Sequence, residues 1–351
     1  MGTLQSKRIE EIDVARGLGI LLVILGHMDG LTSEVWQQFA ASFHMPLFFF
    51  LSGLLMKTED ASLSGFRDFA GRKAKRMLIP YILWALIYAQ GMNGKQLIRI
   101  AYANNRSYAE AGLWFLPTLF VAECVFYLIC VAKKKWGGHV GYTDLLLGTA
   151  CGALGGAMSH VMLRTPLWRV GWPFSLDIAL TAVFFITVGA RCKPLLGKLI
   201  EGGKTVRGRG VMAGAAALLF AAVFAISRLN LRFLFDHSHE RVVMARGSYG
   251  LYPLFLLGAL LGTAGILLLS PSLTKLRTLR YIGHNSLLYM CLNHLMIAMT
   301  TDVVGKMMAI ETLHGPVRIL MVMIVLAAVT LCCTLMTWVI NRFVPVLSGK
   351  S

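Results

Sequence analysis

Residues 319–340 read ILMVMIVLAAVTLCCTLMTWVI and contain no charged side chain. A second charge-free run, VMAGAAALLFAAVFAI, occupies residues 211–226. A helix needs about 20 apolar residues to cross a bilayer. The composition agrees, because 56% of the 351 residues are hydrophobic and 15% are charged, whereas about a quarter of the residues in soluble domains are charged. The sequence therefore predicts an all-α, polytopic membrane protein.

Hydropathy, read together with the positions of charges and prolines, predicts about ten transmembrane helices. No internal repeat or low-complexity linker divides the chain, so we expect one domain over residues 1–351. The predicted spans are 12–29, 39–56, 78–92, 114–132, 144–163, 175–190, 211–228, 251–270, 283–301 and 317–341.

The distribution of basic residues predicts the topology. With the N-terminus in the cytoplasm, the cytoplasmic segments hold 22 of the 34 Lys and Arg residues. This asymmetry follows the positive-inside rule and places both termini in the cytoplasm. The net charge of +17 is thus explained by topology, and no nucleic-acid-binding motif accompanies it. Glu10, Glu11 and Asp13 interrupt the basic N-terminal region, so we expect the first span to be retained rather than cleaved as a signal peptide.

The first predicted span carries three ionisable side chains, Asp13, Arg16 and His27. Such groups are costly inside a membrane and usually face the bundle interior or a watery cavity. Arg16 and His27 are eleven residues apart, about three helical turns, so they share a face roughly 16 Å apart along the axis. Asp13 lies one turn before Arg16 and is placed to pair with it. Alternatively, these side chains have structural roles only: Arg16 extends to the lipid headgroups, and His27 forms a hydrogen bond within the helix bundle.

The second predicted span begins with a histidine, in the sequence SFHMPLFFF of residues 42–50. Because a short external loop joins the first two spans, we expect His44 at the same depth as His27. A histidine that is neutral near pH 7 is a natural general base for a hydroxyl group. A bound metal is the rival interpretation, but no third ligand occurs at helical spacing. We therefore predict a polar pocket that contains both imidazoles and no metal.

Other polar residues within predicted spans are candidates for a supporting role, together with Asp13. Glu123 lies in the middle of the fourth span, where it is placed to orient a histidine or an acceptor hydroxyl, or to hydrogen-bond between helices. His294 lies toward the external end of the ninth span, at a depth comparable with that of His27. Asn285 begins that span, and its default role is helix capping.

These residues occur in a pattern that resembles the acyltransferase 3 family, and within it the fucose 4-O-acetylase-like branch. The most specific blocks are Asp13-x-x-Arg16, His27 within LGH, and SFHMPLFFFLSG at residues 42–53. Further similar blocks, collinear over most of the chain, are Pro80-Tyr81, LWFLP at residues 113–117, and GHNSL at residues 283–287 followed by His294.

The resemblance implies an enzyme that transfers an acyl group, usually acetyl, from cytoplasmic acyl-CoA to a carbohydrate hydroxyl at the bacterial inner membrane. It implies functional roles for Arg16 and His27 and, by extension, for His44. We expect Arg16, with Arg72 and Arg76 of a cytoplasmic basic cluster, to hold the CoA phosphates. The acceptor is then a glycan or lipid-linked sugar, and acetyl-CoA or another acyl-CoA is a substrate rather than a permanently bound cofactor.

Two alternatives remain open from the sequence. The first concerns mechanism: the acceptor hydroxyl attacks the thioester directly with His27 as general base, or His27 or another residue is acylated first. The second concerns class: a transporter of an acylated sugar or lipid also uses intramembrane ionisable residues. Transporters commonly contain repeated halves, which this sequence does not show, and so we favour the acyltransferase.

Overall fold

A computed structural model describes residues 9–89, 93–104, 112–135, 142–234, 241–307 and 315–350. These residues form helices and contain no strand, apart from one isolated bridge between Val243 and Ser248. The predicted all-α class is therefore confirmed.

The helices follow one another along the chain, with several short 3-10 turns between them. The first seven are α1 (Glu10–Gly26), α2 (Glu34–Ala41), α3 (His44–Leu55), α4 (Leu63–Tyr88), α5 (Gly94–Tyr102), α6 (Phe115–Lys135) and α7 (Thr143–Leu163). The second seven are α8 (Leu176–Arg191), α9 (Lys193–Gly203), α10 (Val206–Asn230), α11 (Tyr252–Leu269), α12 (Arg277–His284), α13 (Ser286–Met307) and α14 (Gly315–Phe343).

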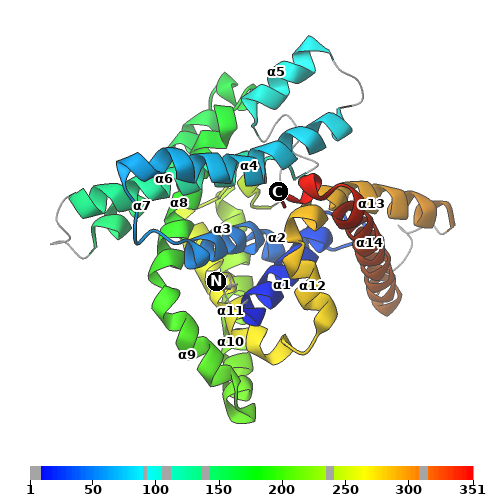
Figure 1. Ribbon diagram of the computed structural model, residues 1–351. Coiled ribbons are helices and arrows are strands. Elements are labelled where there is room, and N and C mark those ends of the chain that lie inside the picture. The colour runs from blue at the N-terminus through cyan, green and yellow to red at the C-terminus, as the bar shows by residue number, and fades with distance from the viewer. Residues whose placement is uncertain are drawn as a thin grey trace.

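Helices α1 and α3 lie at the centre of the bundle (Figure 1). Helix α1 packs against α3, α12 and α13, and α3 packs against α8 and α11. Helices α4 and α6 run across one side, α10 packs along α11, and α13 and α14 pack together at another side (Figure 1). Helix α1, which ends just before His27, and α3, which begins at His44, are thus enclosed by other helices.

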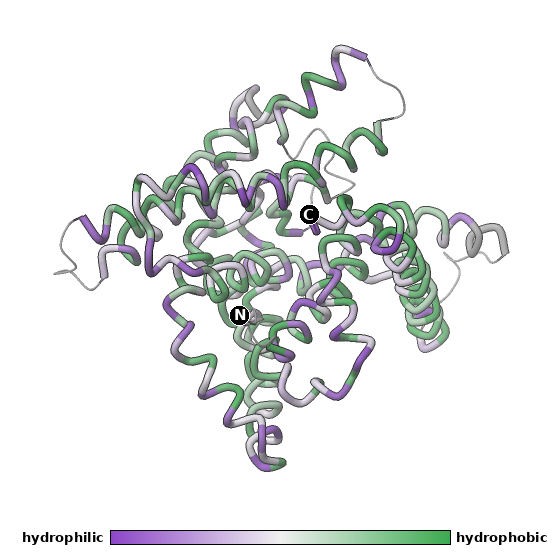
Figure 2. Tube along the Cα trace, in the orientation of Figure 1, coloured by the Kyte–Doolittle hydropathy of each residue, from purple (hydrophilic) through white to green (hydrophobic). Residues whose placement is uncertain are grey.

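By length and composition, seven helical stretches of the described chain are apolar enough to cross a membrane. Hydrophobic residues dominate the length of α14 (Figure 2), yet only 17% of its most apolar window is buried. An apolar face that the protein does not cover is suited to contact with lipid. The chain is therefore a multi-pass membrane protein. The seven stretches are Glu34–Leu55, Phe115–Lys135, Thr143–Leu163, Pro173–Arg191, Val206–Phe233, Tyr252–Leu273 and Gly315–Phe343.

The other three predicted spans fall on helices outside this group. Span 12–29 corresponds to α1, span 78–92 to the C-terminal part of α4, and span 283–301 to α12 and α13. Residues 90–92, the end of the predicted third span, lie outside the described residues. The total of about ten spans and the cytoplasmic placement of both termini stay predictions.

Two pairs of glycines allow the central helices to touch at their backbones. A Cβ atom on Gly283 of α12 would lie 1.7 Å from the carbonyl oxygen of Asp13 in α1, and one on Gly17 would lie 2.3 Å from that of Leu279. The same reciprocal contact joins α3 to α8: a Cβ on Gly53 would lie 1.9 Å from the Ile186 oxygen, and one on Gly189 would lie 2.1 Å from that of Phe50. Small residues at such crossings are typical of membrane helix packing. They fix α1 and α3 in place.

Candidate active site

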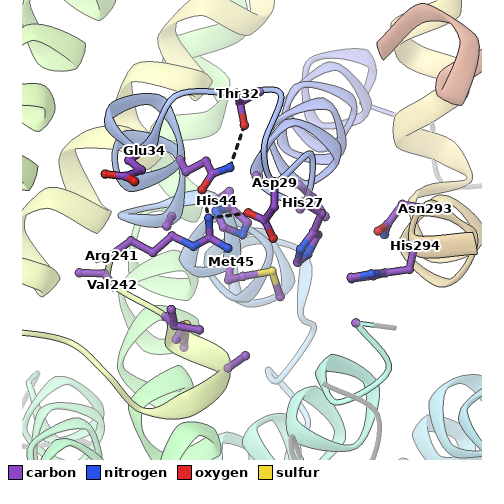
Figure 3. Close-up of a pocket in the computed structure, with 18 of the residues that line it drawn as sticks. His27, Asp29, Thr32, Glu34, His44, Met45, Arg241, Val242, Asn293 and His294 are labelled. Carbon is purple, nitrogen blue, oxygen red and sulfur yellow. Dashed lines mark hydrogen bonds and ion pairs between the residues drawn. The ribbon is translucent and has the colours of Figure 1, made fainter. Parts of the chain in front are cut away.

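A cavity of about 1050 Å³ opens where α1, α2, α3 and α13 meet the segment that precedes α11. It contains the three histidines His27, His44 and His294, one from each of α1, α3 and α13. Figure 3 shows their rings directed toward the same space. The sequence predicted a shared pocket for His27 and His44 and a similar depth for His294. The structure brings all three together.

His27 lies at the C-terminal cap of α1, where its backbone N–H donates to the carbonyl of Ile24. Its side chain is partly buried, and its ring centroid lies 4.3 Å from that of His294. The Nε2 atom of His294 is buried and has no hydrogen-bond partner among the described residues. A buried polar atom without a partner costs free energy unless a ligand or water satisfies it. The His27–His294 pair is therefore suited to a polar ligand.

His44 has a defined orientation at the start of α3. Its Nδ1 atom lies 2.7 Å from the carbonyl oxygen of Ala40. Because a carbonyl only accepts hydrogen bonds, Nδ1 must carry the proton, which assigns the lone pair of the neutral ring to Nε2. His44 therefore offers the cavity a hydrogen-bond acceptor.

The chain between the first two histidines is more structured than expected. We predicted an external loop at 30–38, but much of this stretch belongs to α2. Gln37 and Gln38 of α2 are buried, and the Gln38 carbonyl accepts a hydrogen bond of 2.8 Å from the Ser42 hydroxyl. Arg318 of α14 donates to the carbonyls of Gly30 and Leu31 at 3.0 and 2.9 Å. These contacts hold the turn that separates His27 from His44.

Arg241 lines the cavity but was not among the predicted site residues. Its Nη1 atom pairs with Asp29 Oδ1 at 3.0 Å and also donates to Gln37 Oε1 (Figure 3). The sequence blocks that carry the family resemblance do not extend to this region of the chain. One signal was available: Arg241 and Arg246 lie on a predicted external segment, where Lys and Arg are depleted.

Of the predicted donor-binding and supporting residues, only His294 lines the cavity, and the others lie away from its lining. Asp13 is buried and Arg16 partly buried in the N-terminal half of α1, whereas Arg72 and Arg76 are exposed on α4. Asn285 caps α12, where its Oδ1 atom accepts from Asn341 Nδ2 at 3.0 Å. Along α1, His27 thus lies at the C-terminal end, and Asp13 and Arg16 lie in the N-terminal half.

Glu123 of α6 does not contact any of the cavity histidines. Its side chain is 3% exposed, and its Oε2 atom lies 2.7 Å from Lys73 Nζ of α4. Its Oε1 atom accepts a hydrogen bond from the Ser52 hydroxyl of α3. Glu123 therefore connects α3, α4 and α6. This agrees with the hydrogen bond between helices that was one of its two predicted roles.

Replacing Glu123 with Gln is expected to lower the free energy of unfolding by about 1–3 kcal/mol, since it leaves the partly buried Lys73 without a counter-charge. Lys73 is 26% exposed, and solvent moderates the loss. Thermal unfolding in detergent measures the effect. Glu201→Gln is the matched control, because its pair with Lys204 is exposed and should contribute less than about 0.5 kcal/mol. If the two variants are equally stable, Glu123 does not form a stabilising ion pair with Lys73.

The acyltransferase 3 family model, described as an acyltransferase domain, matches residues 9–338. No curated protein and no solved structure matches significantly. The matched range includes all three cavity histidines and Arg241.

Proposed function

Because this chain belongs to the acyltransferase 3 family, we propose that it moves an acetyl group from acetyl-CoA to a hydroxyl of a glycan or lipid-linked sugar in the bacterial inner membrane. The family and the apolar helices together make it a membrane acyltransferase. The donor, the acceptor and the bacterial inner membrane are part of the proposal. One observation carries it: three histidines from three helices line one cavity.

His27 is the general base in this proposal. It takes the proton of the acceptor hydroxyl while the hydroxyl oxygen attacks the thioester carbonyl. The tetrahedral intermediate then collapses, the carbon–sulfur bond breaks, and the CoA thiolate takes the proton back from His27. The products are the acetyl ester and free CoA. The 4.3 Å approach of His294 restricts the ring of His27, and this supports a fixed base rather than a mobile one.

The second histidine orients the acceptor. With Nδ1 committed to Ala40, the Nε2 atom of His44 accepts a hydrogen bond from a sugar hydroxyl. Correct orientation of two reactants lowers the barrier because rotational and translational freedom is lost on binding rather than in the reaction step. His44 therefore serves positioning, and His27 serves proton transfer.

The half of α1 that contains Arg16 receives the donor in this proposal. Arg16, with Arg72 and Arg76, binds the phosphates of CoA by charge-assisted hydrogen bonds. The long flexible arm of CoA then directs the thioester along α1 toward His27, roughly 16 Å away for eleven helical residues. A donor and an acceptor thus approach the cavity from opposite ends of one helix.

The Arg16→Gln variant is expected to raise the KM for acetyl-CoA roughly 10-fold or more, because a hydrogen bond to a charged group contributes about 1.5–3 kcal/mol. Its kcat should change much less, since Arg16 is remote from the reacting atoms. Initial rates over a range of acetyl-CoA concentrations separate the two effects. Arg342→Gln, a change at an exposed arginine in the last turn of α14, is the control. A change in kcat alone would contradict the donor role.

Labelled acetyl-CoA tests the proposed reaction. Purified protein in proteoliposomes is incubated with [14C]acetyl-CoA and a panel of glycans. We expect label on the glycan and one free CoA thiol for each acetyl group transferred. Label that stays on the protein without an acceptor would indicate the two-step route instead. Uptake of a sugar conjugate into the vesicles without acyl-CoA, and without any transfer, would favour a transporter and refute the proposal.

A further inference from the structure

The cavity has a second polar wall, opposite the His27–His294 pair, that the proposed reaction does not use. It is formed by the segment Arg241–Gly250, here called the wall segment (Figure 3). This segment lies between α10 and α11 in the chain. Its residues 241–246 line the cavity, and so its rigidity determines where their side chains point.

Buried amide side chains hold the wall segment at both ends. At one end, the Val242 backbone N–H donates to Gln38 Oε1 at 2.7 Å, and Gln38 Nε2 donates to the Ser227 carbonyl at 3.1 Å. At the other end, Asn230 Nδ2 donates to the Tyr249 carbonyl at 2.8 Å. Gln38 is 1% exposed and Asn230 is 2% exposed. Hydrogen bonds at such depth are costly to break, so the wall segment is preformed.

Arg241 is the first residue of this segment, and part of its guanidinium group forms no hydrogen bond within the described residues. Nη1 is shared between Asp29 and Gln37. No hydrogen bond within the described residues engages Nε or Nη2 of Arg241, or Oδ2 of Asp29. Arg241 and Asp29 therefore present free donors and a free acceptor side by side, whereas the Gln37 amide is engaged at both ends, by Arg241 and by Thr32. The contacts of Arg241 with Asp29 and Gln37 fix the relative positions of these side chains.

Alternating donors and acceptors match a particular ligand chemistry. A hydroxyl group both donates and accepts, so a ring with neighbouring hydroxyls pairs with an arginine and a carboxylate at once. A carboxylate or phosphate ligand only accepts hydrogen bonds, so at this wall it would pair with Arg241 but be repelled by the Asp29 carboxylate beside it. Asp29 moreover balances the charge of Arg241. The wall is therefore better suited to an uncharged ligand than to an anion.

We propose that Arg241, held in place by Gln37, and Asp29 are the specificity-determining residues for the acceptor, and that they bind hydroxyls of an uncharged sugar ring beside the hydroxyl that is acylated. This inference rests on the proposed function of the same cavity. The wall holds the ring by its neighbouring hydroxyls and presents one hydroxyl to His27 across the cavity. These residues bind the acceptor and take no part in the transfer of the proton.

Titration calorimetry on the purified full-length protein in nanodiscs tests this binding without requiring a reaction. The probes are methyl glycosides of glucose, galactose, rhamnose and fucose, and methyl glucuronide, which carries a carboxylate where the glucoside has a hydroxymethyl group. We expect at least one neutral glycoside to bind more tightly than the glucuronide. Arg241→Gln and Asp29→Asn should each weaken that binding by about 10-fold or more, as expected for hydrogen bonds to charged groups. Arg232→Gln changes an exposed arginine outside the cavity and should leave binding unchanged.

Three outcomes would overturn the inference: no glycoside binds, the glucuronide binds more tightly than every neutral glycoside, or Arg241→Gln and Asp29→Asn bind like the Arg232→Gln control. Failure of the proposed function is distinguishable. In that case the glycoside binds with the expected dependence on Asp29 and Arg241, but [14C]acetyl-CoA transfers no label to it.

Discussion

The His27→Ala variant is expected to lose between about 10²- and 10⁴-fold in the rate of acetyl transfer, which is the usual contribution of a positioned general base. Without the imidazole, the attacking hydroxyl must lose its proton to water or to a poorly placed neighbour. The loss should appear in kcat at saturating acetyl-CoA, because His27 lies about three helical turns from the donor-binding Arg16. Release of CoA thiol, followed by absorbance with a thiol reagent, measures it.

The control for this prediction is a histidine outside the cavity. His160 is exposed at the end of α7, and His160→Ala should retain the full rate. Size-exclusion chromatography and thermal unfolding show whether both variants remain folded. Transfer at the wild-type rate by a folded His27→Ala protein would exclude His27 as the base and would leave His44 and His294 as the remaining imidazoles of the cavity.

The Gly283→Ala variant is expected to lose much of its stability, by about 3 kcal/mol or more. The added Cβ would lie 1.7 Å from the Asp13 carbonyl oxygen, so α12 must move away from α1. Forcing a methyl group into a packed contact typically costs 1–3 kcal/mol, and backbone on the opposing side yields less readily than a side chain. The yield of monodisperse protein and its thermal midpoint in detergent measure the effect.

A glycine in open space provides the control. A Cβ on Gly210 of α10 would meet nothing within 4 Å, and alanine is favoured over glycine in a helix by roughly 0.5–1 kcal/mol. Gly210→Ala should therefore be neutral or slightly stabilising. If Gly283→Ala is as stable as Gly210→Ala, the close crossing of α1 and α12 is wrong, and with it the placement of His27.

The long apolar helices were predictable because their signal is local. The charge-free run at 319–340 predicted a span at 317–341, and α14 occupies Gly315–Phe343. The fourth predicted span, 114–132, corresponds to α6 at Phe115–Lys135. Each such helix is defined by its own composition, since about 20 apolar residues are sufficient to favour the bilayer.

Parts of the site depended on contacts between distant residues and could not be predicted. The common depth of His27 and His44 was predictable, because only a short connection joins the two predicted spans. The 4.3 Å contact of His27 with His294 depends on how α13 packs against α1, and no periodicity encodes that. The position of Arg241 is set by the bond between Val242 and Gln38, 204 residues apart. Helix α2 was missed because its polar residues resemble a loop.

Affinity labelling with bromoacetyl-CoA tests most directly whether the acyl group reaches the histidine cavity. This donor analogue carries an alkylating carbon next to the thioester carbonyl, so it marks nucleophiles within reach of the reacting atoms. Peptide mass spectrometry after labelling in proteoliposomes locates the modification. We predict alkylation of His27 or His294, with protection by excess acetyl-CoA. Modification confined to residues outside the cavity, such as Cys124 of α6, with the histidines unlabelled, would contradict the account.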